Sequence, residues 1–263
     1  MFSSTTERKH SANNIRCLVM VALLLTLIIL SLFFSGCDEQ LSISILGDSM
    51  STYRRISNSS RYNSTLTENT VFYPNSKYDG GNIKATQTWW QLVARALGGK
   101  ILVNNSCSGA KVTGKQTYAT RSVNLHNKRG NTPDVIIILI GENDFGHSVS
   151  LNAFEQAYRV MLRNVTDAYG NAQIYCCTFL PDRKRQDTTV NDGGIDEREY
   201  LSIIQSIATE FGVKIIDLYN DSGITQDNID DYTLDRLHPN ARGMKLIADC
   251  VVAAISSYAK QLF

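Results

Sequence analysis

Five short apolar runs recur along the chain beyond residue 40, and each is separated from the next by a segment long enough for a helix. The runs are rich in Val and Ile, which is typical of strands that are buried on both faces of a sheet. Alternation of this kind predicts right-handed crossovers and an α/β fold with a parallel five-stranded sheet covered by helices on both faces. The predicted strands are Leu41–Leu46, Lys100–Asn104, Val135–Ile140, Gln173–Phe179 and Val213–Leu218.

Three of the intervening and following segments carry apolar residues at steps of three and four, the period of an amphipathic helix. These apolar positions run from Phe154 to Val165, from Tyr200 to Phe211 and from Met244 to Tyr258. The chain shows no internal repeat and no sign of a second domain. We therefore expect one domain over residues 38–263.

The N-terminus has the pattern of an export signal. Basic residues precede the apolar run Cys17–Phe34, and the small residues Ser35 and Gly36 lie directly before Cys37. This ending resembles the bacterial lipobox, in which the cysteine is lipidated. We predict that residues 1–37 are a lipoprotein signal peptide and that Cys37 anchors the protein to a membrane of the bacterial cell envelope, with the domain facing outside the cytoplasm. An uncleaved transmembrane anchor is the alternative, because the apolar run just reaches spanning length.

Charge and cysteine usage bear on the partners. With a formal net charge of only +1, the sequence gives no reason to expect a nucleic-acid partner. Apart from Cys17 and Cys37, the cysteines form no C-x-x-C pair and have no histidine at metal spacing, so no metal site is predicted. Cys176 and Cys177 are neighbours in a predicted strand and suit a buried core. A disulfide such as Cys107–Cys176 stays open.

Polar clusters follow four of the predicted strands. In an open parallel sheet, ligands bind at the carboxyl ends of the strands. Side chains from these clusters should therefore share one cleft. The clusters are Gly47–Ser49 after the first strand, Asn105–Gly109 after the second, Gly141–Asp144 after the third and Asp235–Asn240 after the fifth.

These clusters contain the groups that acyl transfer needs. Ser49 can attack an ester carbonyl if His238 accepts its proton and Asp235 orients the imidazole. The oxyanion that forms needs fixed donors, which the backbone N–H groups of Ser49 and Gly109 and the amide of Asn143 can supply. Gly109 suits this role because a residue without Cβ permits close approach of a substrate.

The four clusters resemble the sequence blocks of the GDSL, or SGNH, family of serine esterases and lipases. The blocks read Gly47-Asp48-Ser49, Gly109, Gly141-x-Asn143-Asp144 and Asp235-x-x-His238, and they occur in family order. The resemblance implies a three-layer α/β/α sandwich of the flavodoxin-like SGNH type. It also implies ester hydrolysis without a cofactor, carried out by Ser49, Gly109, Asn143 and His238.

A long polar segment from Tyr53 to Trp90 is rich in aromatic residues. It predicts a cleft that binds a small-molecule or glycan ester, with Tyr73, Trp89, Trp90 and His147 as substrate-binding residues. Such rings suit the faces of sugars, which favours short acyl groups, acetyl above all, on carbohydrate. Alternatively, Trp89 and Trp90 cap the core.

Two other motifs in the sequence resemble functional sites. Asp144-x-x-His147 has the same spacing as Asp235-x-x-His238 and also follows a strand, but we predict His238 as the base because the helix-starting Pro239 fixes its loop. Residues 109–116, GAKVTGKQ, nearly spell a phosphate-binding loop, yet Gln116 replaces the Ser or Thr that would hold magnesium.

Two other functions stay open on sequence alone. One is an acyltransferase in which a sugar hydroxyl replaces water, and the other is an inactive binding module that kept the fold.

Overall fold

The computed structural model divides the chain into two units, Met1–Glu39 and Gln40–Phe263, and only the second is described below. The predicted signal peptide and Cys37 lie outside the described residues. Within the described part, none of the helices has both the length and the apolar character needed to cross a membrane. The structure describes residues 40–56, 71–79, 82–114, 121–182 and 189–262.

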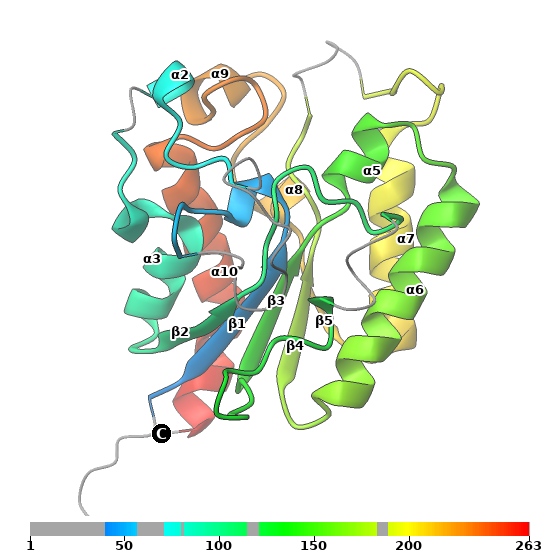
Figure 1. Ribbon diagram of the computed structural model, residues 1–263. Coiled ribbons are helices and arrows are strands. Elements are labelled where there is room, and N and C mark those ends of the chain that lie inside the picture. Colours follow the sequence, from blue (N-terminus) through cyan, green and yellow to red (C-terminus); the bar gives the residue numbers. More distant parts are fainter. Residues whose placement is uncertain (1–39, 57–70, 80–81, 115–120, 183–188, 263) are drawn as a thin grey trace, which may run out of the picture. The chain divides into compact units, whose positions relative to one another are not determined.

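The centre of the domain is a five-stranded parallel sheet of order β2-β1-β3-β4-β5 (Figure 1). The predicted sheet is confirmed, with strand ends that differ by one or two residues. The fifth strand stops early because Asp217 caps the next short helix, its carboxylate accepting the N–H of Asn220. The strands are β1 (Ser42–Gly47), β2 (Lys100–Asn104), β3 (Val135–Leu139), β4 (Gln173–Cys177) and β5 (Lys214–Ile216).

Long helices cover both faces of the sheet, which makes three layers (Figure 1). Helices α3 and α10 pack together on one face, and α6 and α7 pack together on the other. Side chains of β3 alternate between the two cores: Ile137 lies with α3 and α10, and Ile138 lies with α6 and α7. The long helices are α3 (Trp89–Ala96), α6 (Leu151–Ala168), α7 (Glu197–Glu210) and α10 (Ala241–Leu262).

Short helices gather near the carboxyl ends of the strands. The helix η1 follows β1 almost directly, and α5 follows β3 in the same way. In this sheet order the switch point lies between β1 and β3, so both short helices stand where a ligand is expected. The short helices are η1 (Ser49–Ser51), α2 (Ser76–Asp79), η3 (Ala85–Gln87), α5 (Glu142–Gly146), α8 (Leu218–Asp221) and α9 (Ile229–Tyr232).

Three of the predicted substrate-binding aromatics are core residues instead. Trp89 and Trp90 have no exposed surface and pack in the core shared by α3 and α10, where the Trp89 N–H also meets the sulfur of Met244. Tyr73 is equally buried, and its hydroxyl donates to the carbonyl of Pro239 at 2.7 Å. Their substrate-binding assignment was wrong because all three rings lie in the core with no exposed surface for a substrate to contact.

The cysteines of the described residues form no disulfide. Cys176 and Cys177 lie fully buried on β4, as their place in a strand predicted. Burial raises the pKa of the Cys176 thiol to about 12, so this thiol stays protonated and behaves as a small apolar group. Among the described residues, no three His, Cys, Asp or Glu side chains lie close enough to hold a metal ion.

Candidate active site

The first part of the site is the turn that carries Ser49 from the end of β1 into η1. A Cβ on Gly47 would lie 2.7 Å from the Ser51 hydroxyl and 2.9 Å from the Leu139 carbonyl, so this position has room only for glycine. Because Gly47 has no Cβ, the end of β1 can lie close to Leu139 of β3, and the chain can turn directly into η1. Ser49, 4% exposed, therefore stands at the carboxyl edge of the sheet.

Asp48 braces this turn. It is the N-cap of η1, and its Oδ1 accepts the N–H of Met50 at 3.0 Å. Its other oxygen is buried and has no hydrogen-bond partner among the residues that the structure describes. Burial, helped by the charge of Asp144, raises the pKa of Asp48 to about 7. The described contacts of Asp48 are those of a structural residue.

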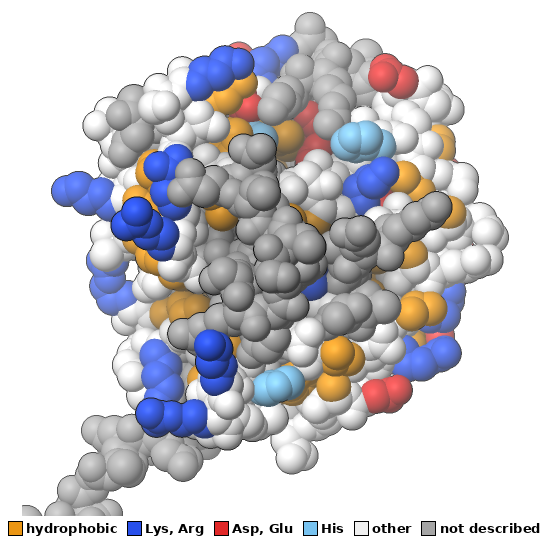
Figure 2. Space-filling model, in the orientation of Figure 1, with side chains coloured by type: hydrophobic (Ala, Val, Ile, Leu, Met, Phe, Trp, Pro, Cys, Tyr) orange, Lys and Arg blue, Asp and Glu red, His pale blue; other side chains and the backbone are white. Residues whose placement is uncertain are grey.

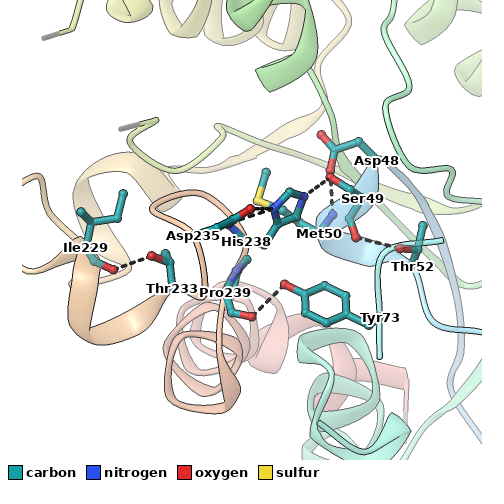
Figure 3. A network of polar contacts seen from close by, with 10 residues as sticks. All are labelled: Asp48, Ser49, Met50, Thr52, Tyr73, Ile229, Thr233, Asp235, His238 and Pro239. Carbon is teal, nitrogen blue, oxygen red and sulfur yellow. Dashed lines mark hydrogen bonds and ion pairs between the residues drawn. The ribbon is translucent and has the colours of Figure 1, made fainter. Parts of the chain in front are cut away.

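The structure brings together the three side chains predicted as a triad (Figure 3). The Nε2 atom of His238 lies 2.8 Å from Oγ of Ser49, and Nδ1 lies 3.0 Å from each carboxylate oxygen of Asp235. The Asp235 and His238 side chains are each 6% exposed. With Nδ1 protonated and donating to the carboxylate, Nε2 is left to accept the serine proton.

The acid and the base of this chain come from one tight loop. The His238 N–H donates to Oδ1 of Asp235 at 2.9 Å, and the Leu234 N–H donates to the His238 carbonyl at 2.7 Å. Arg236, between them, adopts the left-handed region at φ 65°. The Asp-x-x-His spacing therefore forms the carboxylate–imidazole pair within one loop, and the fold then places this loop beside Ser49.

Asn143 supplies an unused donor. It lies in α5, is 7% exposed, and its Nδ2 is buried without a hydrogen-bond partner in the described structure. A buried donor left in this state is costly and rare, and it calls for an acceptor that a ligand can bring. The described structure likewise records no acceptor for the backbone N–H groups of Ser49 and Gly109.

The loop that carries Gly109 is tied to α5 by Asp144. Its Oδ2 accepts the Val112 N–H at 2.7 Å, while Oδ1 accepts the N–H and the hydroxyl of Thr113 at 3.1 and 2.7 Å. Gly109 itself is exposed at φ +71°, a conformation that favours glycine. Asp144 therefore holds two of the proposed oxyanion-binding segments together.

The second Asp-x-x-His pair does not form. The carboxylate of Asp144 is committed to Val112 and Thr113. His147 is exposed, and its Nδ1 lies 2.7 Å from the backbone carbonyl of Asn143. The imidazole that contacts Ser49 is that of His238.

One aromatic contact at this site was not anticipated from the sequence. The ring of Phe72 stacks on the imidazole of His238, with centroids 3.5 Å apart and an interplanar angle of 7°. Phe72 lies in the long polar segment after β1, and the only sequence signal was that this segment is rich in aromatic residues.

Figure 2 shows the face of the domain seen in Figure 1. Lys and Arg side chains are spread around its margin, interspersed with other polar groups, and form no continuous stripe on the described surface in this view. Lys115 and Gln116, at the end of the phosphate-loop-like segment, lie outside the described residues.

A parallel 2-1-3-4-5 sheet with a hydrogen-bonded Ser–His–Asp chain at its carboxyl edge has the architecture of a serine hydrolase. The chain belongs to the GDSL-like lipase/acylhydrolase family, whose sequence profile matches residues 45–246. This confirms the resemblance seen in the four blocks and makes the domain a carboxylic ester hydrolase by class.

Individual relatives agree with the family. The chain is 29% identical over 143 residues to an acetylxylan esterase of Xylanibacter ruminicola, a match that covers 47% of this chain and only 28% of that longer relative. The crystal structure of a protein from Bacteroides uniformis, described as a GDSL-like lipase, has a TM-score of 0.62 and 25% identity, covering 86% of this chain and 99% of the other.

A family two carbohydrate esterase of Clostridium thermocellum, in an active-site mutant form, shares the fold. Its TM-score is 0.53 at 18% identity, covering 83% of this chain and 64% of that one.

Proposed function

We propose that this protein is an exported serine esterase that hydrolyses short acyl esters, acetyl groups above all, carried by carbohydrate. The observation that supports it most is the unbroken hydrogen-bonded chain from Oγ of Ser49 through His238 to Asp235. A serine hydroxyl in such a chain is an activated nucleophile for an ester carbonyl.

The reaction proceeds in two steps. Oγ of Ser49 attacks the carbonyl carbon while its proton passes to Nε2 of His238, and the tetrahedral intermediate then collapses as the leaving alcohol takes that proton. Water attacks the resulting acyl-serine and gives its proton to the same nitrogen, which returns it to Ser49 as the acid departs. Asp235 holds the tautomer and stabilises the imidazolium in both steps.

The carbonyl oxygen becomes an anion in both tetrahedral intermediates. Nδ2 of Asn143 and the backbone N–H groups of Ser49 and Gly109 are the donors proposed to bind it. The lack of any acceptor for Asn143 Nδ2 among the described residues supports this role. The donors are fixed in advance by η1, by α5 and by the bonds of Asp144 to the loop after β2.

Two findings support the proposed substrate class. The relative from Xylanibacter ruminicola is an acetylxylan esterase, which favours an acetylated carbohydrate as the substrate of this chain. The large apolar side chains that the described residues expose stand on separate segments of the chain, which favours a short acyl group over a long one. They are Ile56, Tyr78, Val123, Val160 and Val190.

Acyl length is the direct test. The value of kcat/KM on aryl esters should be highest for acetyl or propionyl and should fall towards octanoyl, because the described residues expose their large apolar side chains on separate segments, which gives added methylenes little surface to bury. The full chain should also release acetate from acetylated xylan, and Ser49→Ala is the matched control. A marked rise from acetyl to octanoyl would contradict the substrate class. Acetyl transfer to an added sugar in place of acetate release would favour the acyltransferase.

The anchor is a separate part of the proposal. We infer from the apolar run Cys17–Phe34 and the small residues before Cys37 that the protein is a lipoprotein of the bacterial cell envelope. The full-length protein should partition into membranes with a lipidated Cys37 as its first residue, and Cys37→Ser should block that maturation. Mass spectrometry of the N-terminus decides, because an unprocessed N-terminus in the wild type would favour a transmembrane anchor.

A further inference from the structure

We propose that Phe72 is a positioning residue that holds the imidazole of His238 in its working plane and stabilises its charged form. The inference rests on the proposed function, because Phe72 would act through the catalytic base. The two rings are nearly parallel, at 7°, with centroids 3.5 Å apart. Phe72 is half-buried, packs against the edge of the core and also contacts the rings of Tyr73 and Tyr78, so its side chain is held in place beside the imidazole.

The backbone of Phe72 is fixed to the serine turn by one hydroxyl. Oγ1 of Thr52 accepts the Phe72 N–H at 2.9 Å and donates to the Ser49 carbonyl at 2.8 Å. Thr52 is fully buried, so water does not compete for these bonds. These two hydrogen bonds fix the position of the Phe72 backbone relative to Ser49.

The neighbouring residue fixes the same segment to the histidine loop. The hydroxyl of Tyr73 donates to the carbonyl of Pro239, which directly follows His238 (Figure 3). The Tyr73 carbonyl accepts the Arg54 N–H at 2.8 Å, and its ring meets the imidazole edge-on, with centroids 6.4 Å apart. Residues 72 and 73 therefore bridge the two loops whose side chains must meet.

The stack restrains tilting of the imidazole out of its plane, which is the motion that the hydrogen bonds at its two nitrogens restrain least. A hydrogen bond to a ring nitrogen is strongest near the plane of the ring, so the bonds of Nδ1 to Asp235 and of Nε2 to Ser49 resist rotation within the plane better than tilting out of it. The Phe72 ring blocks tilting on one face. An aromatic face also attracts a cation, so it favours the imidazolium that forms when His238 takes the serine proton.

Replacement of the ring by an apolar side chain of similar size tests this. In the full-length protein, Phe72→Leu should lower kcat on an aryl acetate by about 5- to 30-fold, with KM changed by less than about threefold. The acid limb of kcat/KM should move to lower pH, because the protonated imidazole loses its aromatic partner. Phe72→Tyr keeps the ring and should restore both values to near those of the wild type.

Tyr78→Leu is the matched control. The Tyr78 ring stacks on Phe72 at a centroid distance of 6.0 Å, so its loss removes an aromatic contact of the same segment while leaving the Phe72–His238 pair in place. Its kcat and acid limb should match the wild type. Equal effects of Phe72→Leu and Tyr78→Leu would overturn the proposal, and so would a Phe72→Leu variant with a wild-type kcat and acid limb or with a loss confined to KM.

A readout without turnover separates this inference from the proposed function. The imidazole of His238 can be titrated by NMR, assigned by comparison with His238→Ala, and its midpoint should be lower in Phe72→Leu than in the wild type. If the wild type turns over no ester, the proposed function fails while this titration still tests the stack. If the wild type is active and both midpoints agree, only the role of Phe72 fails.

Discussion

His238→Ala should lower kcat on an aryl acetate by about four to six orders of magnitude, because members of a Ser–His–Asp chain act as a unit. In the structure His238 is the imidazole within hydrogen-bond reach of Ser49, at 2.8 Å, and its other nitrogen is held by Asp235. Without it, no other side chain of the described residues lies within hydrogen-bond reach of Oγ of Ser49 to accept its proton. Ser49→Ala should be similarly inactive, and the double variant should be no worse than either single one.

His147→Ala is the control for this prediction. Its imidazole is exposed and bound to the Asn143 carbonyl, so its removal should leave kcat within about threefold of the wild type. Melting temperatures of both variants show whether a loss of activity reflects unfolding. An inactive His147→Ala variant beside an active His238→Ala variant would reverse the assignment of the base.

Asn143→Ala should lower kcat by about a hundred- to a thousandfold with little change in KM. The reason is that Nδ2 of Asn143 is buried without a partner in the described structure and gains a full bond only when the carbonyl oxygen becomes an anion. An interaction made only in the transition state affects kcat and kcat/KM alike. Steady-state kinetics on one aryl acetate measures both values.

Asn191→Ala is the matched control. Asn191 is also a buried amide beside α5, but its Nδ2 already donates to the carbonyl of Phe145 in that helix at 2.9 Å. This variant should lose stability, seen as a lower melting temperature, while its folded fraction keeps its kcat. An Asn143→Ala variant that raises KM and leaves kcat unchanged would mean that Asn143 binds the ground state and lies outside the oxyanion hole.

The parts of the site that could be predicted from the sequence are those formed by residues close together along the chain. Four of the five predicted strands are apolar runs followed by a polar cluster, and a parallel sheet brings its strand ends together whatever the details of the helices. The pair Asp235 and His238 is three residues apart and builds its own hydrogen bonds within one loop. Position along the chain was therefore enough to place these groups.

The parts that sequence did not predict depend on contacts between distant segments. Composition marked the segment after β1 as aromatic but could not tell which rings would turn into the core, as Tyr73 and Trp90 do. The stack of Phe72 on His238 joins residues 166 positions apart in the sequence, and so does the hydrogen bond from Tyr73 to Pro239 beside it. Such pairings are set by tertiary packing, which no local period records.

The central claim is that Ser49 forms a covalent acyl-enzyme, and rapid quenching of the wild-type protein during turnover of an aryl acetate tests it most directly. Peptide mapping of the quenched protein by mass spectrometry should find one acetyl group on Ser49, none on the neighbouring Ser51, and none in the Ser49→Ala variant. An acetyl group on Ser51 or elsewhere that appears and decays at the rate of turnover, with Ser49 unmodified, would contradict the account.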